Sequence, residues 1–295
     1  MRVKSSGSLL GLLLALALPV QAGIEVTDGL DRSVTLEKPA ERIIALAPHI
    51  VENAFSAGAG DKLVAAVNYS DYPPEARELP QLGSYKAVSL EQILALEPDL
   101  VLMWASGNGE ETLRQLERLG VTVYASEPRE LEDVAQSVID IGILAGTREV
   151  AETAAGDYLE SLEQLRDQYA ERDPVSVFYQ VWNKPLQTLN DEHLVSAVIR
   201  LCGGRNVYAD AAPLAPKINM ESVLDRNPQV IVASGMGDER PEWLDEWQDW
   251  PDLTAVQEGN LFFVPPDIIQ RHTIRIAQGA RLFCEHIETA RQRLD

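Results

Sequence analysis

Short apolar runs, many of them rich in β-branched residues, alternate with stretches of helical periodicity along the chain. The runs indicate short buried strands at 43–46, 63–67, 100–103, 121–124, 177–180, 230–233 and 261–264. Continuous apolar strands separated by helices are typical of parallel sheets that are covered on both faces. Helical patterns at 192–201 and 273–294 continue this arrangement in the second half of the chain.

A different pattern separates the two sets of strands. From 148 to 172 there is no proline, and apolar residues recur at alternating spacings of four and three: Ala151, Ala155, Tyr158, Leu162, Leu165 and Tyr169. Such spacing predicts one amphipathic helix, which would be about 37 Å long and could connect two lobes. Pro174 ends it.

An internal repeat supports two related lobes. The segment SLEQILALEPDLVL (89–102) aligns without gaps with NMESVLDRNPQVIV (219–232), at an offset of 130. Each copy predicts a capping residue (Ser89 or Asn219), a short helix, a proline that ends the helix, and a buried strand. Glu91 and Glu221 occupy the same place in the first turn, where a carboxylate gains about 0.3–1 kcal/mol from the helix dipole.

These patterns predict an α/β fold with two Rossmann-like lobes, whose mainly parallel sheets are joined by one long linker helix. We expect the N-terminal lobe at 23–147, the linker helix at 148–172 and the C-terminal lobe at 173–295. A chain of 295 residues with 45% hydrophobic content can bury two such cores.

The first 22 residues differ from the rest of the chain. Arg2 and Lys4 precede an apolar run at 9–18, and small residues occupy the positions that a signal peptidase reads before Gly23. We predict a cleavable signal peptide, because this run is too short for the roughly 30 Å hydrocarbon core and no longer run follows. No cysteine that could accept a lipid follows it, so we expect a soluble protein in a periplasm.

The charge balance excludes one class of partner. The chain has 46 acidic and 25 basic residues, a net charge of -21. Such an excess repels phosphate backbones, so we expect no nucleic-acid partner.

Only two cysteines are present, Cys202 and Cys284. In an oxidising compartment a pair of cysteines favours a disulfide. Two buried free thiols are the alternative.

Sequence motifs of enzymes and metal sites are missing. There is no Walker loop, dinucleotide fingerprint or Gly-x-Ser-x-Gly elbow, so we expect no enzyme. The four histidines, His49, His193, His272 and His286, lack the spacing of helical metal ligands, so we predict no metal site and assign them to the surface or to helix caps. His49 has an alternative, pocket-lining role, because it follows the first strand and parallel sheets present ligands at the carboxyl ends of their strands.

Three tryptophans near the C-terminal end of the chain share a helical spacing. Trp243, Trp247 and Trp250 fall at i, i+4 and i+7, which places them on one face of a helix. We therefore assign all three to the core.

Several motifs carry a resemblance to a known family. NYSDYPP (68–74), followed by SLEQILALEPDLVLMW (89–104), resembles the vitamin B12-binding branch of the helical-backbone solute-binding proteins of ABC importers. The similarity extends from Arg42 to the C-terminus and includes LCGG (201–204) with the late Cys284. It implies two lobes joined by a rigid helix, a ligand in the cleft with little closure, and a Cys202–Cys284 disulfide.

The resemblance also implies a set of ligand contacts. They are Tyr69, Tyr85 and Trp104 on the first lobe, and Asp267 and Arg271 on the second. A corrin ring is a broad apolar plate fringed with amides, so flat aromatic faces and a few polar groups suit it. Arg271 can donate to amide carbonyls or to a phosphate, with Asp267 orienting it.

This sequence departs from the family at some of these positions. Gln187, Ala215 and Ile268 stand where the family has aromatic residues. Trp182 is a local candidate for the lost aromatic surface, and His49 could ligate cobalt when an axial position is open.

The predicted function is capture of cobalamin or a related corrinoid in the cleft and its delivery to an inner-membrane ABC importer. We expect a monomer with no cofactor of its own. The resemblance implies that it docks on the permease through Glu91 and Glu221. An iron-siderophore or haem receptor of the same fold is the alternative. A divalent-metal receptor and a secreted α/β enzyme are less favoured, because neither clustered ligands nor a nucleophile set is evident.

Overall fold

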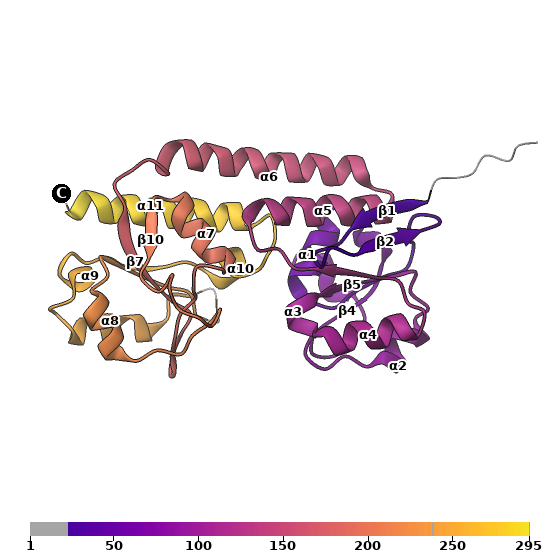
Figure 1. Ribbon diagram of the computed structural model, residues 1–295, viewed down its shortest axis with the longest axis horizontal. Coiled ribbons are helices and arrows are strands. Elements are labelled where there is room, and N and C mark those ends of the chain that lie inside the picture. The colour runs from indigo at the N-terminus through magenta and orange to yellow at the C-terminus, as the bar shows by residue number, and fades with distance from the viewer. Residues whose placement is uncertain (1–22, 236, 238, 295) are drawn as a thin grey trace, which may run out of the picture.

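The computed structural model describes residues 23–235, 237 and 239–294. The signal peptide predicted at 1–22 lies outside the described residues. Figure 1 shows two α/β lobes side by side, with a long helix, α6 (Arg148–Tyr169), running along one side of both. Each lobe contains a four-stranded parallel sheet, so the predicted fold class is confirmed. Within the described ranges, no helix combines the length and the apolar character that a membrane span requires.

The sheet of the N-terminal lobe has the strand order β4-β3-β5-β6, and all neighbours are parallel. An antiparallel hairpin, β1 with β2, precedes it. The elements are β1 (Ile24–Thr27), β2 (Ser33–Leu36), β3 (Ile43–Ala45), α1 (Pro48–Ser56), η1 (Gly60–Lys62), β4 (Leu63–Ala66), η2 (Pro74–Glu78), α2 (Leu90–Ala95), β5 (Leu100–Trp104), α3 (Ala105–Asn108), α4 (Glu110–Arg118), β6 (Val123–Ser126) and α5 (Leu131–Ala145).

The sheet of the C-terminal lobe has the order β10-β7-β11-β12, again with parallel neighbours. A short antiparallel hairpin joins β8 to β9. The elements are β7 (Val175–Gln180), β8 (Trp182–Asn183), β9 (Leu186–Gln187), α7 (Leu194–Leu201), β10 (Gly204–Asn206), α8 (Met220–Arg226), β11 (Val230–Ala233), η3 (Glu242–Asp249), α9 (Thr254–Gln257), β12 (Leu261–Phe263), α10 (Pro266–Ile269) and α11 (Ile276–Leu294).

The two sheets share one topology. Numbered within its own lobe, each parallel sheet has the order 2-1-3-4, and the strands of the internal repeat, β5 and β11, both take the third place. The predicted caps are present, since the backbone N–H of Gln92 donates to Ser89 Oγ (3.3 Å) and that of Ser222 to Asn219 Oδ1 (2.8 Å). The repeat in the sequence is therefore a repeat in the fold.

The predicted strands are all present, each within two residues of its expected bounds. Strand β10 and both hairpins had no apolar run to reveal them. Helix α7 starts two residues later than predicted because His193 is its N-cap, with Nδ1 accepting from the backbone N–H of Val195 (3.2 Å). Helix α6 ends three residues early, at Tyr169, and α11 begins at Ile276 rather than at 273. The division of the chain at 147 and 173 stays a proposal.

Helix α6 buries the predicted apolar stripe, from Ala151 to Tyr169. It packs along α5 of one lobe and α11 of the other, and Figure 1 shows α6 running above these two helices, which lie end to end. One apolar cluster contains residues of all three helices, of α7 and of strand β7, so the core is continuous between α5 and the C-terminal lobe.

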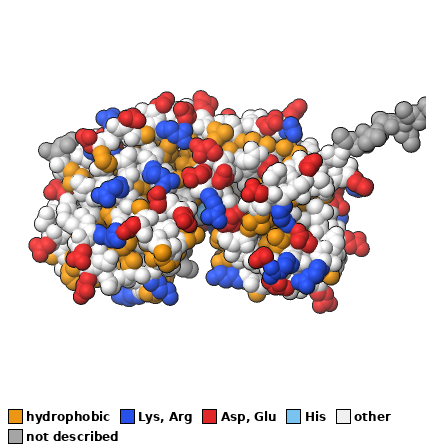
Figure 2. All heavy atoms as spheres, in the orientation of Figure 1, with side chains coloured by type: hydrophobic (Ala, Val, Ile, Leu, Met, Phe, Trp, Pro, Cys, Tyr) orange, Lys and Arg blue, Asp and Glu red, His pale blue; other side chains and the backbone are white. Residues whose placement is uncertain are grey.

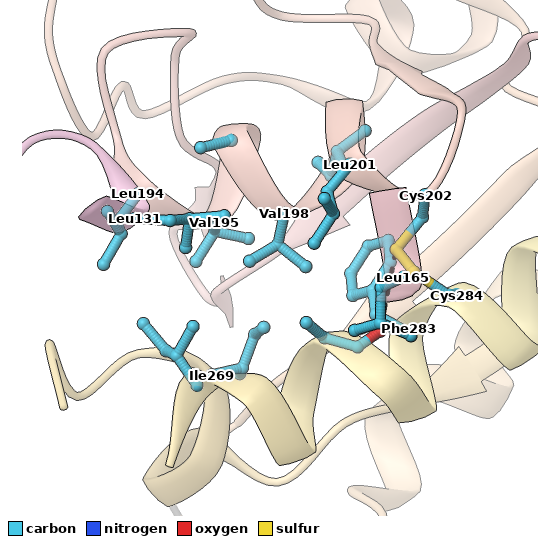
Figure 3. Packing of buried hydrophobic residues seen from close by; sticks show 14 of the residues in the cluster. Leu131, Leu165, Leu194, Val195, Val198, Leu201, Cys202, Ile269, Phe283 and Cys284 are labelled. Carbon is cyan, nitrogen blue, oxygen red and sulfur yellow. Dashed lines mark hydrogen bonds between the residues drawn. A yellow bond between two sulfur atoms is a disulfide. The ribbon is translucent and has the colours of Figure 1, made fainter. Parts of the chain in front are cut away.

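Figure 3 shows part of this cluster, with Val195 and Val198 of α7 facing α11. At its edge, Cys202 and Cys284 form a disulfide between the end of α7 and α11. Both residues are fully buried.

The tryptophan prediction is wrong for Trp250. Trp247 is buried and its Nε1 donates to Gln180 Oε1 (2.7 Å), and Trp243 is half-buried, but Trp250 is exposed. The segment Glu242–Asp249 is a 3₁₀ helix rather than an α-helix, and Trp250 follows its end. Because Trp250 lies beyond the last residue of this helix, the helical spacing does not bring it to the face that buries Trp247.

Candidate functional site in the interlobe cleft

A cavity of about 260 Å³ lies where the carboxyl ends of the two sheets face each other. Figure 2 shows a notch between the lobes. On the N-terminal lobe His49 follows β3 and Trp104 ends β5, the two strands between which the strand order reverses, as expected for a ligand site in such sheets. The lining residues are Pro48, His49, Trp104, Val181, Leu189, His193, Gln270, Arg271 and His272. The volume is below the roughly 300–1,000 Å³ of a typical ligand pocket, so the cavity can hold only part of a large ligand.

Two aromatic rings of the N-terminal lobe lie against each other at this place; Trp104 lines the cavity and Tyr85 lies behind it. The ring centroids of Tyr85 and Trp104 are 5.8 Å apart at an interplanar angle of 36°. Trp104 Nε1 is buried and has no hydrogen-bond partner in the protein. Gly107 permits the position of the indole, because a Cβ there would lie 1.9 Å from the Trp104 ring.

Asn108 holds this pair of rings in place, and sequence reasoning missed it. Its Oδ1 accepts from the backbone N–H of Trp104 (2.7 Å), while its Nδ2 donates to the carbonyls of Leu46 (2.9 Å) and Tyr85 (2.7 Å). The side chain is buried, so it links three segments that are distant in sequence. The sequence feature that could have indicated this role is an asparagine between two glycines, shortly after a predicted strand.

Three histidines from both lobes meet at the cavity. The His272 ring lies 5.5 Å from the ring of His49 and 5.7 Å from that of His193, centroid to centroid. His49 is buried, so the surface assignment is wrong for it, whereas the capping assignment is right for His193. The chain brings these residues together through long-range folding that local spacing does not reveal.

Burial sets the protonation of these histidines. It lowers the pKa of His49 well below the ordinary value, that of His193 to about 3 and that of His272 to about 4. All three are therefore neutral at physiological pH. His49 Nε2 and His272 Nδ1 are buried without a hydrogen-bond partner. Among the described residues, no group of three or more His, Cys, Asp or Glu side chains is arranged to hold a metal ion.

A charged network crosses from one lobe to the other beside the cavity. Arg271 contacts Glu52 (2.6 Å) and Asp71 (2.9 Å) of the N-terminal lobe, and the predicted partner Asp267 (3.1 Å). Arg275 also contacts Glu52 (3.2 Å). The guanidinium of Arg271 is thus already shared among carboxylates, which leaves less of its donor capacity for a ligand.

Glu52 is the centre of this network, and sequence reasoning missed it. Its side chain is 2% exposed, and burial raises the pKa of the carboxyl although both arginines act to lower it. The sequence feature that could have indicated it is a carboxylate beside the apolar residues Ile50, Val51 and Ala54, shortly after a predicted strand. Nearby, Asn53 Nδ2 donates to the His272 carbonyl (3.0 Å), and the Arg275 guanidinium lies 3.8 Å from the Tyr72 ring centroid.

Four of the predicted contacts do not line the cavity: Tyr69, Tyr85, Trp182 and Asp267. Tyr69 is 81% exposed, and its φ of +67° is unusual for a residue other than glycine. Trp182 is half-buried in the β8–β9 hairpin, where Nε1 donates to the Lys184 carbonyl (3.2 Å).

Glu91 and Glu221 are exposed in the first turns of α2 and α8. Figure 1 shows α2 and α8 in the lower part of the view, one on each lobe and away from α6.

Comparisons with known proteins agree with this architecture. A family described as periplasmic binding protein matches residues 43–268. The vitamin B12-binding protein of Vibrio cholerae serotype O1 (strain ATCC 39541) is 39% identical over 254 residues, which cover 86% of this chain and 91% of that protein.

Solved structures give the same result. The crystal structure of the periplasmic vitamin B12 binding protein BtuF of Vibrio cholerae matches with a TM-score of 0.80 and 38% identity, covering 86% of this chain and 98% of that one. The periplasmic heme-binding protein RhuT of Roseiflexus sp. RS-1 matches with a TM-score of 0.73 at 24% identity, covering 85% and 99%, and so shows the shared fold alone.

Proposed function

Since this chain belongs to the periplasmic binding protein family, we propose that it captures cobalamin or a related corrinoid between its lobes and delivers it unchanged to an inner-membrane ABC importer. The observation that carries the proposal is the pair of flat rings, Tyr85 and Trp104, at the cleft of a chain that is 39% identical to a vitamin B12-binding protein. Such rings suit the apolar face of a corrin, and the neutral polar groups around them suit its amide fringe.

The cavity holds part of the ligand and the open groove holds the rest. We propose that Tyr69, Tyr85, Trp182 and Asp267 contact the ligand from the rim, since none of them lines the cavity. An iron chelate or haem is the alternative cargo, on the ground of shared fold only.

Calorimetric titration with cyanocobalamin and with cobinamide tests the cargo. We expect binding of both corrinoids, because Gln187, Ala215 and Ile268 leave the second lobe short of the aromatic surface that would select a complete nucleotide loop. Trp104→Ala should weaken binding by about tenfold or more, the loss expected for one well-packed aromatic contact.

Trp250→Ala is the matched control, since that tryptophan is exposed outside the cleft and its loss should leave the affinity unchanged. Absence of heat with both corrinoids would contradict the proposed function.

We further propose that Glu91 and Glu221 dock on basic residues of the permease. They are exposed at equivalent places in the two copies of the repeat. Charged pairs at such a rim fix orientation and association rate more than affinity. We expect Glu91→Ala with Glu221→Ala to reduce uptake and permease binding while corrinoid binding stays intact.

The control is Asp157→Ala with Glu160→Ala, two exposed acids on α6. Equal uptake by the two double variants would refute the docking role.

Export completes the proposal. We propose that residues 1–22 are removed as a signal peptide and that the protein acts as a monomer in the periplasm. N-terminal sequencing of the secreted protein should begin at Gly23, and light scattering should give the mass of one chain.

A further inference from the structure

The cavity contains polar atoms that the protein itself leaves without partners. His49 is 94% buried, and its Nε2 faces no hydrogen-bonding group; His272 Nδ1 is in the same condition. Buried polar atoms in proteins almost always have a partner, so two orphaned nitrogens at one cavity indicate a group that arrives from outside.

The chemistry of these nitrogens narrows what that group can be. His193 accepts a backbone N–H at Nδ1, so its remaining proton is on Nε2 and it can only donate to a ligand. His49 and His272 have no such constraint, and a neutral imidazole has one nitrogen with a free lone pair. Their rings are 5.5 Å apart and come from opposite lobes, α1 on one side and the loop before α11 on the other.

We propose that an imidazole of the His49–His272 pair ligates the cobalt of a corrinoid whose axial position is open. This inference rests on the proposed function and deepens it, because it names the form of cargo for which the site is built. The step is a ligand exchange: the imidazole nitrogen donates its lone pair to cobalt, and the water that held the axial position leaves. No electron or proton is transferred.

The size of the cavity fits this arrangement. At about 260 Å³ it cannot enclose a corrin ring, so the ring lies above it in the groove and turns one axial face toward the histidines. Neither His49 Nε2 nor His272 Nδ1 gives up a hydrogen bond when its ring turns toward the metal. Trp104 lies against both rings, 5.2 Å and 6.1 Å between centroids, and limits their orientations.

The test compares two corrinoids that differ in their axial positions. Diaquocobinamide has exchangeable water on both faces, whereas cyanocobalamin has its axial positions filled. Binding of diaquocobinamide should shift its visible absorption bands, and cyanocobalamin should bind without such a shift. With cob(II)inamide, the electron paramagnetic resonance spectrum should show splitting from one axial nitrogen, and [15N]histidine labelling should alter that splitting.

Variants locate the ligand. His49→Ala with His272→Ala should abolish the shift and reduce the affinity for diaquocobinamide, relative to cyanocobalamin, by about tenfold or more. His286→Ala is the control, because that ring stacks on Phe262 (4.6 Å between centroids) outside the cavity.

Two failures are distinguishable. A wild-type protein that binds no cyanocobalamin would refute the proposed function itself. A wild-type protein that binds both corrinoids, with no shift and no nitrogen splitting, would overturn the axial ligation alone. The labelled wild-type spectrum decides this even when the double variant fails to fold.

Discussion

Glu52 illustrates how single side chains decide the contact between the lobes. It is a carboxylate with 2% exposure that faces two guanidinium groups from the opposite lobe. Removing its charge leaves Arg275 without its carboxylate contact, while Arg271 keeps Asp71 and Asp267. An uncompensated charge at a buried site costs more than the ion pair itself contributes.

We therefore expect Glu52→Gln to be strongly destabilising. The free energy of unfolding should fall by roughly 3–5 kcal/mol, as found when one partner of a buried ion pair is removed. Urea denaturation followed by circular dichroism measures it. Glu110→Gln, which removes an exposed partner of Arg114, is the control and should change little. Equal urea midpoints for Glu52→Gln and Glu110→Gln would contradict a stabilising role of the buried Glu52 network.

The three histidines make stability depend on pH. Their folded pKa values lie below the ordinary 6.5, so the stabilisation is complete above about pH 6.5 and is lost as the pH falls toward the folded values. Each contributes up to about 1.4 kcal/mol per pH unit in that range. Glu52, with its raised pKa, acts in the opposite direction. We expect the urea midpoint to fall between pH 6.5 and 5.

Variants identify which groups make the urea midpoint fall as the pH decreases. His193→Asn with His272→Asn should flatten the decline, since asparagine can still cap α7 and does not titrate. A slope that is the same in wild type and variant would mean that other groups cause it.

At this scale, no pattern in the sequence indicates the histidine cluster. His49, His193 and His272 are far apart in the chain, and no local spacing connects them. Asn108 and Glu52 were missed for the same reason, because their partners lie on segments that meet only in the folded lobe. Trp104 and Tyr85 were predicted because the family resemblance named their positions, and of the two Trp104 lines the cavity.

Elements were more predictable than contacts. A buried strand is recognisable from its own apolar run, and α6 from its own stripe, so both appear where the pattern places them. Polar edge strands such as β10 lack that signal. The Trp250 error came from extending the helix to a residue that lies beyond its end.

Two glycines inside helices make a matched test of packing. A Cβ at Gly279 of α11 would lie 2.1 Å from the Ile268 carbonyl oxygen of α10, whereas at Gly156 of α6 it would meet nothing within 4 Å. Gly156→Ala should raise the free energy of unfolding by about 0.5–1 kcal/mol through helix propensity. Gly279→Ala should lower it, because α10 must move away.

Thermal denaturation shows whether each variant is more or less stable than the wild type. Similar stabilisation by both alanines would show that α10 and α11 are not in this close contact.

The whole molecule is built to move little. The apolar cluster under α6 spans α5 and the C-terminal lobe, and the Glu52 network ties the lobes together beside the cavity. Separating the lobes would expose this apolar cluster to water and break the Glu52 network.

We therefore expect the radius of gyration from small-angle X-ray scattering to change by less than about 1 Å on binding cyanocobalamin, as in other pre-organised complexes. Bovine serum albumin with the same ligand serves as the scattering control. A contraction of several ångströms would show a hinge that the packed helices do not suggest.

The duplicated sheets with their helices α2 and α8 have a consequence for delivery. Because the two lobes repeat one topology, the capped helix occurs once on each lobe, away from α6 in both. Under the proposed docking, a two-fold symmetric permease would contact Glu91 and Glu221 in either of two orientations of the binding protein. The two orientations would be equivalent for docking, so encounters in both would be productive.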